Sequence, residues 1–97
     1  MVLQLVLGIQ LVYNAKDFLS LIELTKEASP TWNGFPVFGL PFRDVIKRFE
    51  DIGITFSKPF DRSMYLCLDK GIGLYVPLEN KIESFSLFCK GYYDEDL

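Results

Sequence analysis

The densest group of side chains able to do chemistry stands at the C-terminal end of the sequence. Tyr92 and Tyr93 are followed by three consecutive carboxylates, Asp94, Glu95 and Asp96. Tyrosine offers rigid, amphipathic contact area, and adjacent carboxylates steer the approach of a basic surface. We therefore expect these residues to bind a basic protein partner. The alternative is a solvated terminus whose two tyrosines fold onto the edge of a sheet.

The residue types needed for catalysis or metal binding are missing or badly spaced. The chain has no histidine, which excludes Ser-His-Asp and Cys-His arrangements and the commonest metal ligand. Cys67 and Cys89 lie 22 positions apart without a CxxC pair, so they do not predict a zinc site. Gly71-Ile72-Gly73 has no helix after it and is no phosphate loop. We expect no enzyme activity, no cofactor and no metal site.

A second candidate contact group lies in an apolar loop over residues 31–40. This loop carries Trp32, which is the only tryptophan, and Phe35. Asn33-Gly34 favours a turn with positive φ. Aromatic side chains on a rigid loop are typical interface anchors, so Trp32 and Phe35 join the expected partner-binding residues. The alternative is that the loop folds back over the core.

Composition limits the class of protein. The 97 residues predict one domain spanning 1–97, with 91–97 as a flexible acidic tail, and an apolar fraction of 49% is ample for a core. A net charge of −3 argues against direct nucleic-acid binding. The two cysteines fall in predicted strands and fit buried free thiols in a reducing compartment. The apolar stretch 1–13 is too short for a membrane helix and has no signal-peptide features, so we expect a cytoplasmic protein without membrane contact.

Hydrophobic periodicity predicts an α+β fold. Apolar residues alternate from Leu3 to Tyr13, which indicates one long strand. Helical spacing follows from Ala15 to Glu27, with Asn14 as its cap, and again from Pro41 to Ile52. The apolar stripe of the first helix is Phe18, Leu21, Ile22 and Thr25. Short apolar runs separated by polar turns then predict an antiparallel meander over 63–88, and 54–57 is a further short strand. The expected architecture is an antiparallel sheet with two helices on one face.

The segment from Leu40 to Phe88 resembles small bacterial immunity proteins. In those sequences an amphipathic helix precedes a strand of the type Gly-Ile-x-Leu-Tyr, a turn and a strand that begins Lys-Ile, as in Gly71–Val76 and Asn80–Phe88 here. Such proteins neutralise cognate toxins in contact-dependent growth inhibition and pyocin-type systems. The resemblance covers about half of the chain and transfers no binding residue.

What the resemblance implies is a bacterial toxin inhibitor that acts through protein–protein interaction. The expected partner is a basic cognate toxin, such as a nuclease, held in a 1:1 complex, and the chain alone is expected to be a monomer or weak dimer. The alternative is a structural or assembly subunit of a phage or secretion system. Such a subunit would act by strand pairing through the uncharged first strand.

Overall fold

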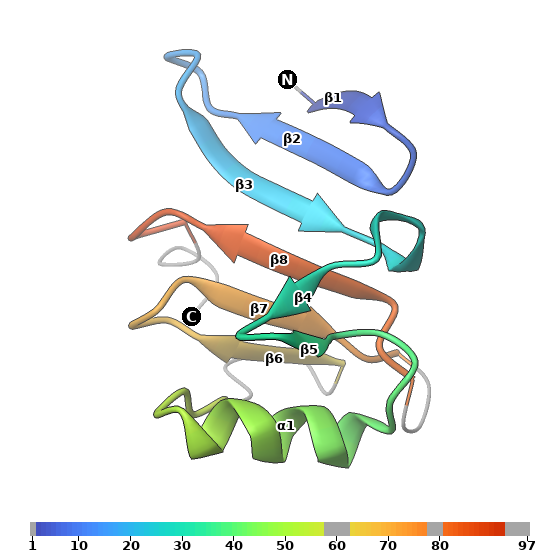
Figure 1. Cartoon of the computed structure of the whole chain (residues 1–97). Helices are drawn as coiled ribbons and strands as arrows, with labels where there is room; N and C mark the ends of the chain where they lie inside the picture. The colour runs from blue at the N-terminus through green and yellow to red at the C-terminus, as the bar shows by residue number, and fades with distance from the viewer. Residues whose placement is uncertain (1, 58–62, 78–80, 93–97) are drawn as a thin grey trace.

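A six-stranded antiparallel sheet in the order β1-β2-β3-β8-β7-β6 forms the frame of the structure (Figure 1). The structure is a computed structural model, and it describes residues 2–57, 63–77 and 81–92. The first three strands and the last three strands are each a consecutive meander, and the two meanders join where β3 pairs with β8. The strands span Val2–Val6 (β1), Ile9–Tyr13 (β2), Leu19–Leu24 (β3), Met64–Cys67 (β6), Ile72–Tyr75 (β7) and Ser84–Phe88 (β8).

The prediction of one long strand over 3–13 is wrong, because the chain reverses in the middle of this segment. β1 and β2 form a hairpin around Leu7 and Gly8. Gly8 has a φ of +88°, which glycine adopts without strain. Its carbonyl also accepts the Thr25 N–H at 2.9 Å, which ties the turn to the end of β3. Alternation of apolar residues continues through such a turn, so the period alone did not reveal it.

The prediction of a helix over 15–27 is also wrong. This segment holds the second hairpin turn, strand β3 and a single 3-10 turn over Lys26–Ala28. Asn14 therefore caps no helix; its Oδ1 accepts the N–H groups of Lys16 and Phe18 in the turn between β2 and β3. β3 lies between β2 and β8, where its backbone groups can pair on both sides. That tertiary pairing outweighs the helical spacing of its apolar residues.

The helix expected after Pro41 is confirmed as α1, Phe42–Asp51, and it is the one α-helix of the described residues. The Pro41 carbonyl accepts the N–H groups of Asp44 and Val45. Gly53 follows the helix with a φ of +89° and its N–H bonds to the Glu50 carbonyl, as in a glycine C-cap. The α+β class with an antiparallel sheet therefore holds, with one helix where two were expected.

The predicted C-terminal meander is confirmed as β6, β7 and β8. Its register places Leu74 between Tyr65 and Phe85, and Ile72 between Cys67 and Leu87. The expected strand over 54–57 is reduced to one bridge, between Ser57 and Leu66. Both cysteines are free; Cys67 is buried, whereas Cys89 follows β8 and is exposed, contrary to the expectation for that residue.

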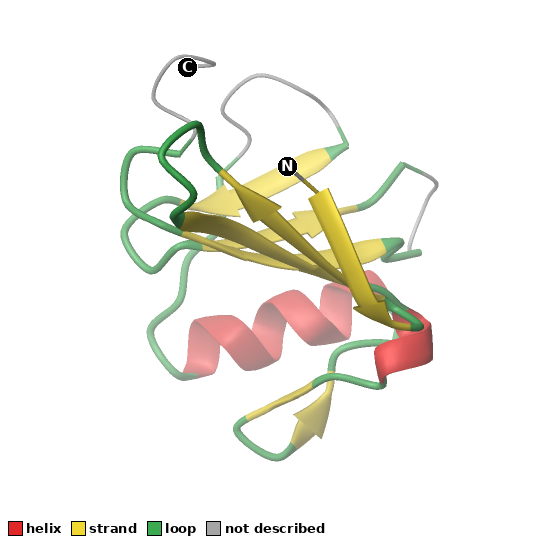
Figure 2. Cartoon of the chain, turned by 90° about the horizontal axis from the view of Figure 1, so that it is seen from above, coloured by secondary structure: helices red, strands yellow, loops and turns green. Residues whose placement is uncertain are grey.

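Two further elements cover one side of the sheet over β6–β7–β8. Figure 2 shows α1 and the small hairpin of β4 (Thr31–Trp32) and β5 (Phe35–Pro36) on the same side. Phe49 of α1 lies at the centre of an aromatic cluster with Trp32, Phe35, Phe56 and Phe85. The buried core is built from this layer and the facing strands: Phe35, Val37, Val45, Phe49, Ile54, Cys67, Ile72, Leu74, Val76 and Phe85.

The two helical elements of the described residues are short. Neither α1 nor the 3-10 turn is long and apolar enough to cross a bilayer.

Candidate functional site

The beginning of the predicted acidic tail is fixed against the sheet. Tyr92 packs on Phe88 with ring centroids 6.3 Å apart, and its N–H donates to the Cys89 carbonyl at 3.1 Å. The Cys89 N–H in turn donates to the Ser20 carbonyl at 3.0 Å. The chain therefore leaves the end of β8 beside the start of β3. The remaining predicted tail contacts, Tyr93, Asp94, Glu95 and Asp96, lie outside the described residues.

Exposed apolar side chains stand where the tail leaves the sheet. Phe18 is 66% exposed and Leu19 is 44% exposed, and both precede Ser20 in the chain. Exposed Cys89 and half-buried Tyr92 follow on the neighbouring strand end. We call these four residues, Phe18, Leu19, Cys89 and Tyr92, the turn surface. Exposed aromatic and apolar side chains are enriched in protein contacts.

Sequence reasoning missed Phe18 and Leu19 because it assigned Phe18 to the buried stripe of a helix. The signal that could have found them is the sequence Asn14-Ala15-Lys16-Asp17. Asp17 has a φ of +63°, and polar residues such as Asn and Asp favour turns of this kind. A turn at this point places Phe18 directly before the first residue of β3, outside the sheet.

The second predicted contact group, Trp32 and Phe35, lies in the β4–β5 hairpin. The expected turn at Asn33-Gly34 is present, with φ values of +48° and +85°. Phe35 is only 6% exposed and meets Phe49 edge-on at 5.2 Å. Trp32 is half-buried against Phe49 and Phe85, at 6.0 Å and 5.9 Å. The loop thus folds back over the core, and in this arrangement Phe35 offers a partner little surface.

Trp32 and Tyr92, one residue from each predicted contact group, lie on opposite faces of the sheet. Trp32 contacts Phe85, whereas Tyr92 contacts Phe88. Residues 85 and 88 of one strand point to opposite faces because side chains alternate along a strand. A flat partner surface cannot contact both groups at once. The Cys89–Ser20 hydrogen bond brings the chain just before Tyr92 beside the strand that follows Phe18 and Leu19, whereas Trp32 lies on the other face.

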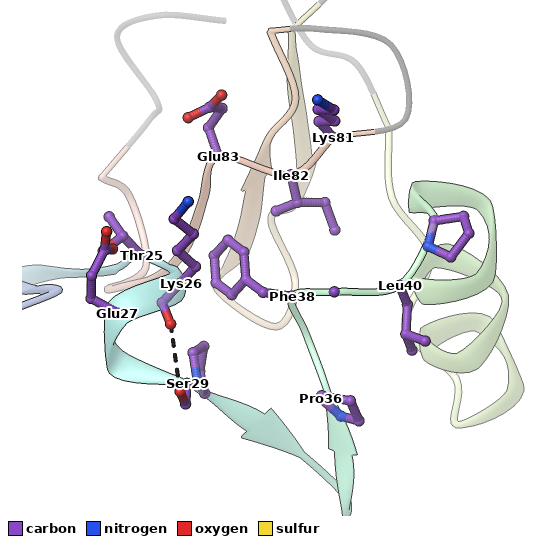
Figure 3. Close-up of a pocket in the computed structure, with 13 residues that line it drawn as sticks. Thr25, Lys26, Glu27, Ser29, Pro36, Phe38, Leu40, Lys81, Ile82 and Glu83 are labelled. Atoms are coloured by element: carbon purple, nitrogen blue, oxygen red, sulfur yellow. Dashed lines mark hydrogen bonds between the residues drawn. The ribbon is translucent and has the colours of Figure 1, made fainter.

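A groove opens on the helix side of the molecule. Its volume is about 1080 Å³, and it opens between the 3-10 turn, the segment from β5 to α1, and residues 81–83. Figure 3 shows Phe38 and Ile82 across from each other, with charged side chains around them. The lining residues are Thr25, Lys26, Glu27, Ser29, Pro30, Pro36, Phe38, Gly39, Leu40, Pro41, Lys81, Ile82 and Glu83.

Apolar side chains and charged side chains of both signs line this groove. Glu27 accepts a hydrogen bond from the Thr25 hydroxyl at 2.5 Å, and this bond lowers the pKa of the Glu27 carboxyl. A carboxyl with a lowered pKa stays ionised near neutral pH and is poorly suited to act as a general acid. Lysines and glutamates both line the groove, so it carries no single sign of charge. Among residues 2–57, 63–77 and 81–92, no cluster of three potential metal ligands occurs.

Comparison of the chain with protein-family models, with curated proteins and with solved structures gives no match.

Proposed function

We propose that this chain is an immunity protein that binds one cognate bacterial toxin domain and neutralises it. It binds through the turn surface together with the acidic residues 94–96, and it blocks the active site or the substrate-binding surface of the toxin. The resemblance of Leu40–Phe88 to small immunity proteins supports the class of partner. The location of the binding surface is supported by the structure of the residues around Tyr92.

The observation that carries the proposal is the exposure of Phe18 and Leu19 beside the start of the tail. Large apolar side chains that project into water in a small domain are typical anchors of protein interfaces. Here they directly precede Ser20, whose carbonyl accepts the Cys89 N–H, and the carboxylates 94–96 follow Cys89 in the sequence. An apolar anchor beside clustered negative charge suits a partner that is basic around an apolar pocket.

The charge of the tail also fits a nuclease as the toxin. The cleft of a nuclease must be basic to hold phosphate groups, and an acidic segment placed in or beside it excludes the substrate by charge and by shape. The chain has a net charge of −3, so long-range attraction to a basic partner adds to the contact. Such attraction raises the association rate and weakens as salt is added.

The direct experiment is co-expression with the product of the immediately upstream open reading frame. We expect a stable 1:1 complex on size exclusion and rescue of growth from the neighbour's toxicity. If the chain stays a monomer and the product of the upstream open reading frame is not toxic, the immunity proposal is contradicted. The surface is then tested with Phe18→Ser, which we expect to weaken binding about tenfold or more, since an anchor residue contributes over about 1.4 kcal/mol.

Leu7→Ser is the matched control for Phe18→Ser. Leu7 is 74% exposed and lies in the β1–β2 turn, at the opposite end of β2 from Phe18. Both changes remove an exposed apolar side chain from a hairpin turn, so general effects on solubility or folding affect both. Equal affinities for the two variants would contradict the location of the surface. Replacing Asp94, Glu95 and Asp96 by their amides tests the tail, because affinity and its salt dependence should both fall.

A specific observation also favours the second candidate, an assembly subunit that acts by strand pairing. β1 is the terminal strand of the sheet, and its residues carry no charge. An assembly subunit grows with concentration in sedimentation experiments, whereas an immunity protein alone stays a monomer or small dimer. Open-ended growth needs a free strand edge on both sides of the sheet.

A further inference from the structure

The two edges of the sheet are unlike each other. At the β6 edge, Ser57 and Leu66 exchange two backbone hydrogen bonds, each 2.8 Å long, so the middle of that edge is occupied by the chain itself. At the other edge, no segment of the described residues pairs with the outer side of β1. An edge strand in this state presents unpaired N–H and C=O groups, which are a template for another strand.

The sequence of β1 is symmetric about its centre. It reads Val2-Leu3-Gln4-Leu5-Val6, which is the same in both directions. When such a strand pairs antiparallel with its own copy about the central residue, each position faces a residue of its own type. No residue of β1 carries a charge, so two copies can pair without like-charge repulsion. Because β1 has no carboxylate, it offers no electrostatic attraction to a basic partner.

We propose that two copies of this chain pair through β1 in antiparallel fashion, about a two-fold axis at Gln4. The two sheets then join into one continuous antiparallel sheet. Because the β6 edge is engaged by Ser57, the pairing closes at a dimer and does not propagate into a fibre. The interface is independent of the turn surface proposed for the toxin, and its test requires no toxin.

The geometry of β1 also sets the strength of the dimer. The register between β1 and β2 shifts between Gln4 and Val6, which marks a bulge near the end of the strand. Bulges twist an edge and shorten the stretch available for pairing. A contact centred on a five-residue strand buries less than the roughly 1,200 Å² of a standard interface. We therefore expect a weak dimer that dissociates on dilution.

Disulfide trapping tests both the pairing and its register. In a Cys89→Ser background, Gln4→Cys places two thiols directly opposite each other across the two-fold axis. Paired residues of antiparallel strands have Cα atoms about 4.5–5.5 Å apart, within the range of a disulfide. We expect Gln4→Cys to form a covalent dimer on mild oxidation, at concentrations where the weak dimer is populated.

Gln10→Cys is the matched control, because Gln10 pairs with Gln4 across β1 and β2 but lies one strand away from the edge. It should remain monomeric under the same oxidation. Leu3→Cys checks the register, since its two copies do not face each other when the axis passes through Gln4. Failure of Gln4→Cys to cross-link in a folded chain, or equal cross-linking of all three variants, would overturn the proposal.

Sedimentation provides a second measurement that does not depend on oxidation. Gln4→Lys sets two like charges opposite each other at the axis and should abolish the concentration-dependent dimer. Gln10→Lys adds the same charge to the neighbouring strand and should leave the dimer in place. A dimer that survives Gln4→Lys unchanged contradicts pairing through β1.

Discussion

The sheet has two halves that differ in what covers them. β6, β7 and β8 carry α1 and the β4–β5 hairpin on one face, and Leu66, Ile72, Leu74 and Phe85 of these strands are at most 2% exposed. In the other half, α1 lies away from β1, β2 and β3 (Figure 1), and all five residues of β2 are only half-buried. β7 therefore stands in a packed core, whereas β2 is partly exposed to solvent.

This difference separates stability from recognition within one small domain. Burial of apolar surface is the main favourable term in folding, so the covered half supplies most of the folding free energy. The uncovered half holds Phe18 and Leu19 of the turn surface and β1, the terminal strand of the sheet. It follows that substitutions in the two halves should have different consequences, and these can be measured.

The largest effect is expected from Phe49→Ala. Phe49 is fully buried at the centre of the aromatic cluster, and its removal leaves a cavity among four rings. We expect a loss of about 3–5 kcal/mol in the free energy of unfolding, measured by urea denaturation. Leu11→Ala, in half-buried β2, should lose only about 1 kcal/mol. Equal losses in the free energy of unfolding for the two variants would contradict the difference in stability between the two halves.

An intermediate effect is expected from Gly8→Ala, which tests how the β1–β2 hairpin is fastened. A Cβ on Gly8 would lie 2.5 Å from the Ala28 nitrogen, and the φ of +88° adds strain. We expect a loss of about 2–3 kcal/mol. Gly34→Ala has a similar φ of +85° and no atom within 4 Å, so it should lose only about 1 kcal/mol.

The comparison of these two glycines isolates the contact from the backbone strain. Denaturant unfolding gives both losses, and amide exchange then locates the effect of Gly8→Ala in β1 and β2. If Gly34→Ala proves as costly as Gly8→Ala, the packing of the turn against the 3-10 segment contributes nothing.

The smallest effect is expected from Thr25→Val, at the point where the chain leaves β3. The Thr25 hydroxyl lowers the pKa of Glu27, so the bond stabilises the fold above the ordinary pKa of a glutamate and is lost as the pH falls through the lowered value. The variant should raise the pKa of Glu27 in an NMR titration and barely alter stability at neutral pH. A Glu27 pKa that does not move would assign the shift to another cause.

The covered half could be predicted from the sequence and the uncovered half could not. The apolar residues Val45 and Phe49 predict only a helix, because Pro41 marks its start and Gly53 its end. In the same way, the turn residues Asp69-Lys70-Gly71 mark the ends of the meander strands. In the segment 15–27, Phe18, Leu21, Ile22 and Thr25 match helical spacing. That segment becomes a strand only because β2 and β8 flank it, and such pairing is not visible in local sequence.

The candidate site, too, could be predicted only in part from the sequence. Tyr92 was predicted as a contact from its type and its position before the carboxylates, and the structure places it at the turn surface. Phe18 and Leu19 were missed because their exposure depends on the turn after Asn14. Phe35 was proposed from its place in an apolar loop, but burial against Phe49 is a tertiary property that composition did not reveal.

The most direct measurement is amide hydrogen exchange, on the free chain and on its mixture with the product of the neighbouring open reading frame. In the free chain we expect slow exchange in β7 and β8 and faster exchange in β1 and β2. On mixing, protection should appear around Phe18–Leu19 and Cys89–Tyr92, while α1 stays unchanged. Protection confined to α1 and β6, with those segments unaffected, would contradict the assignment of recognition to the uncovered half.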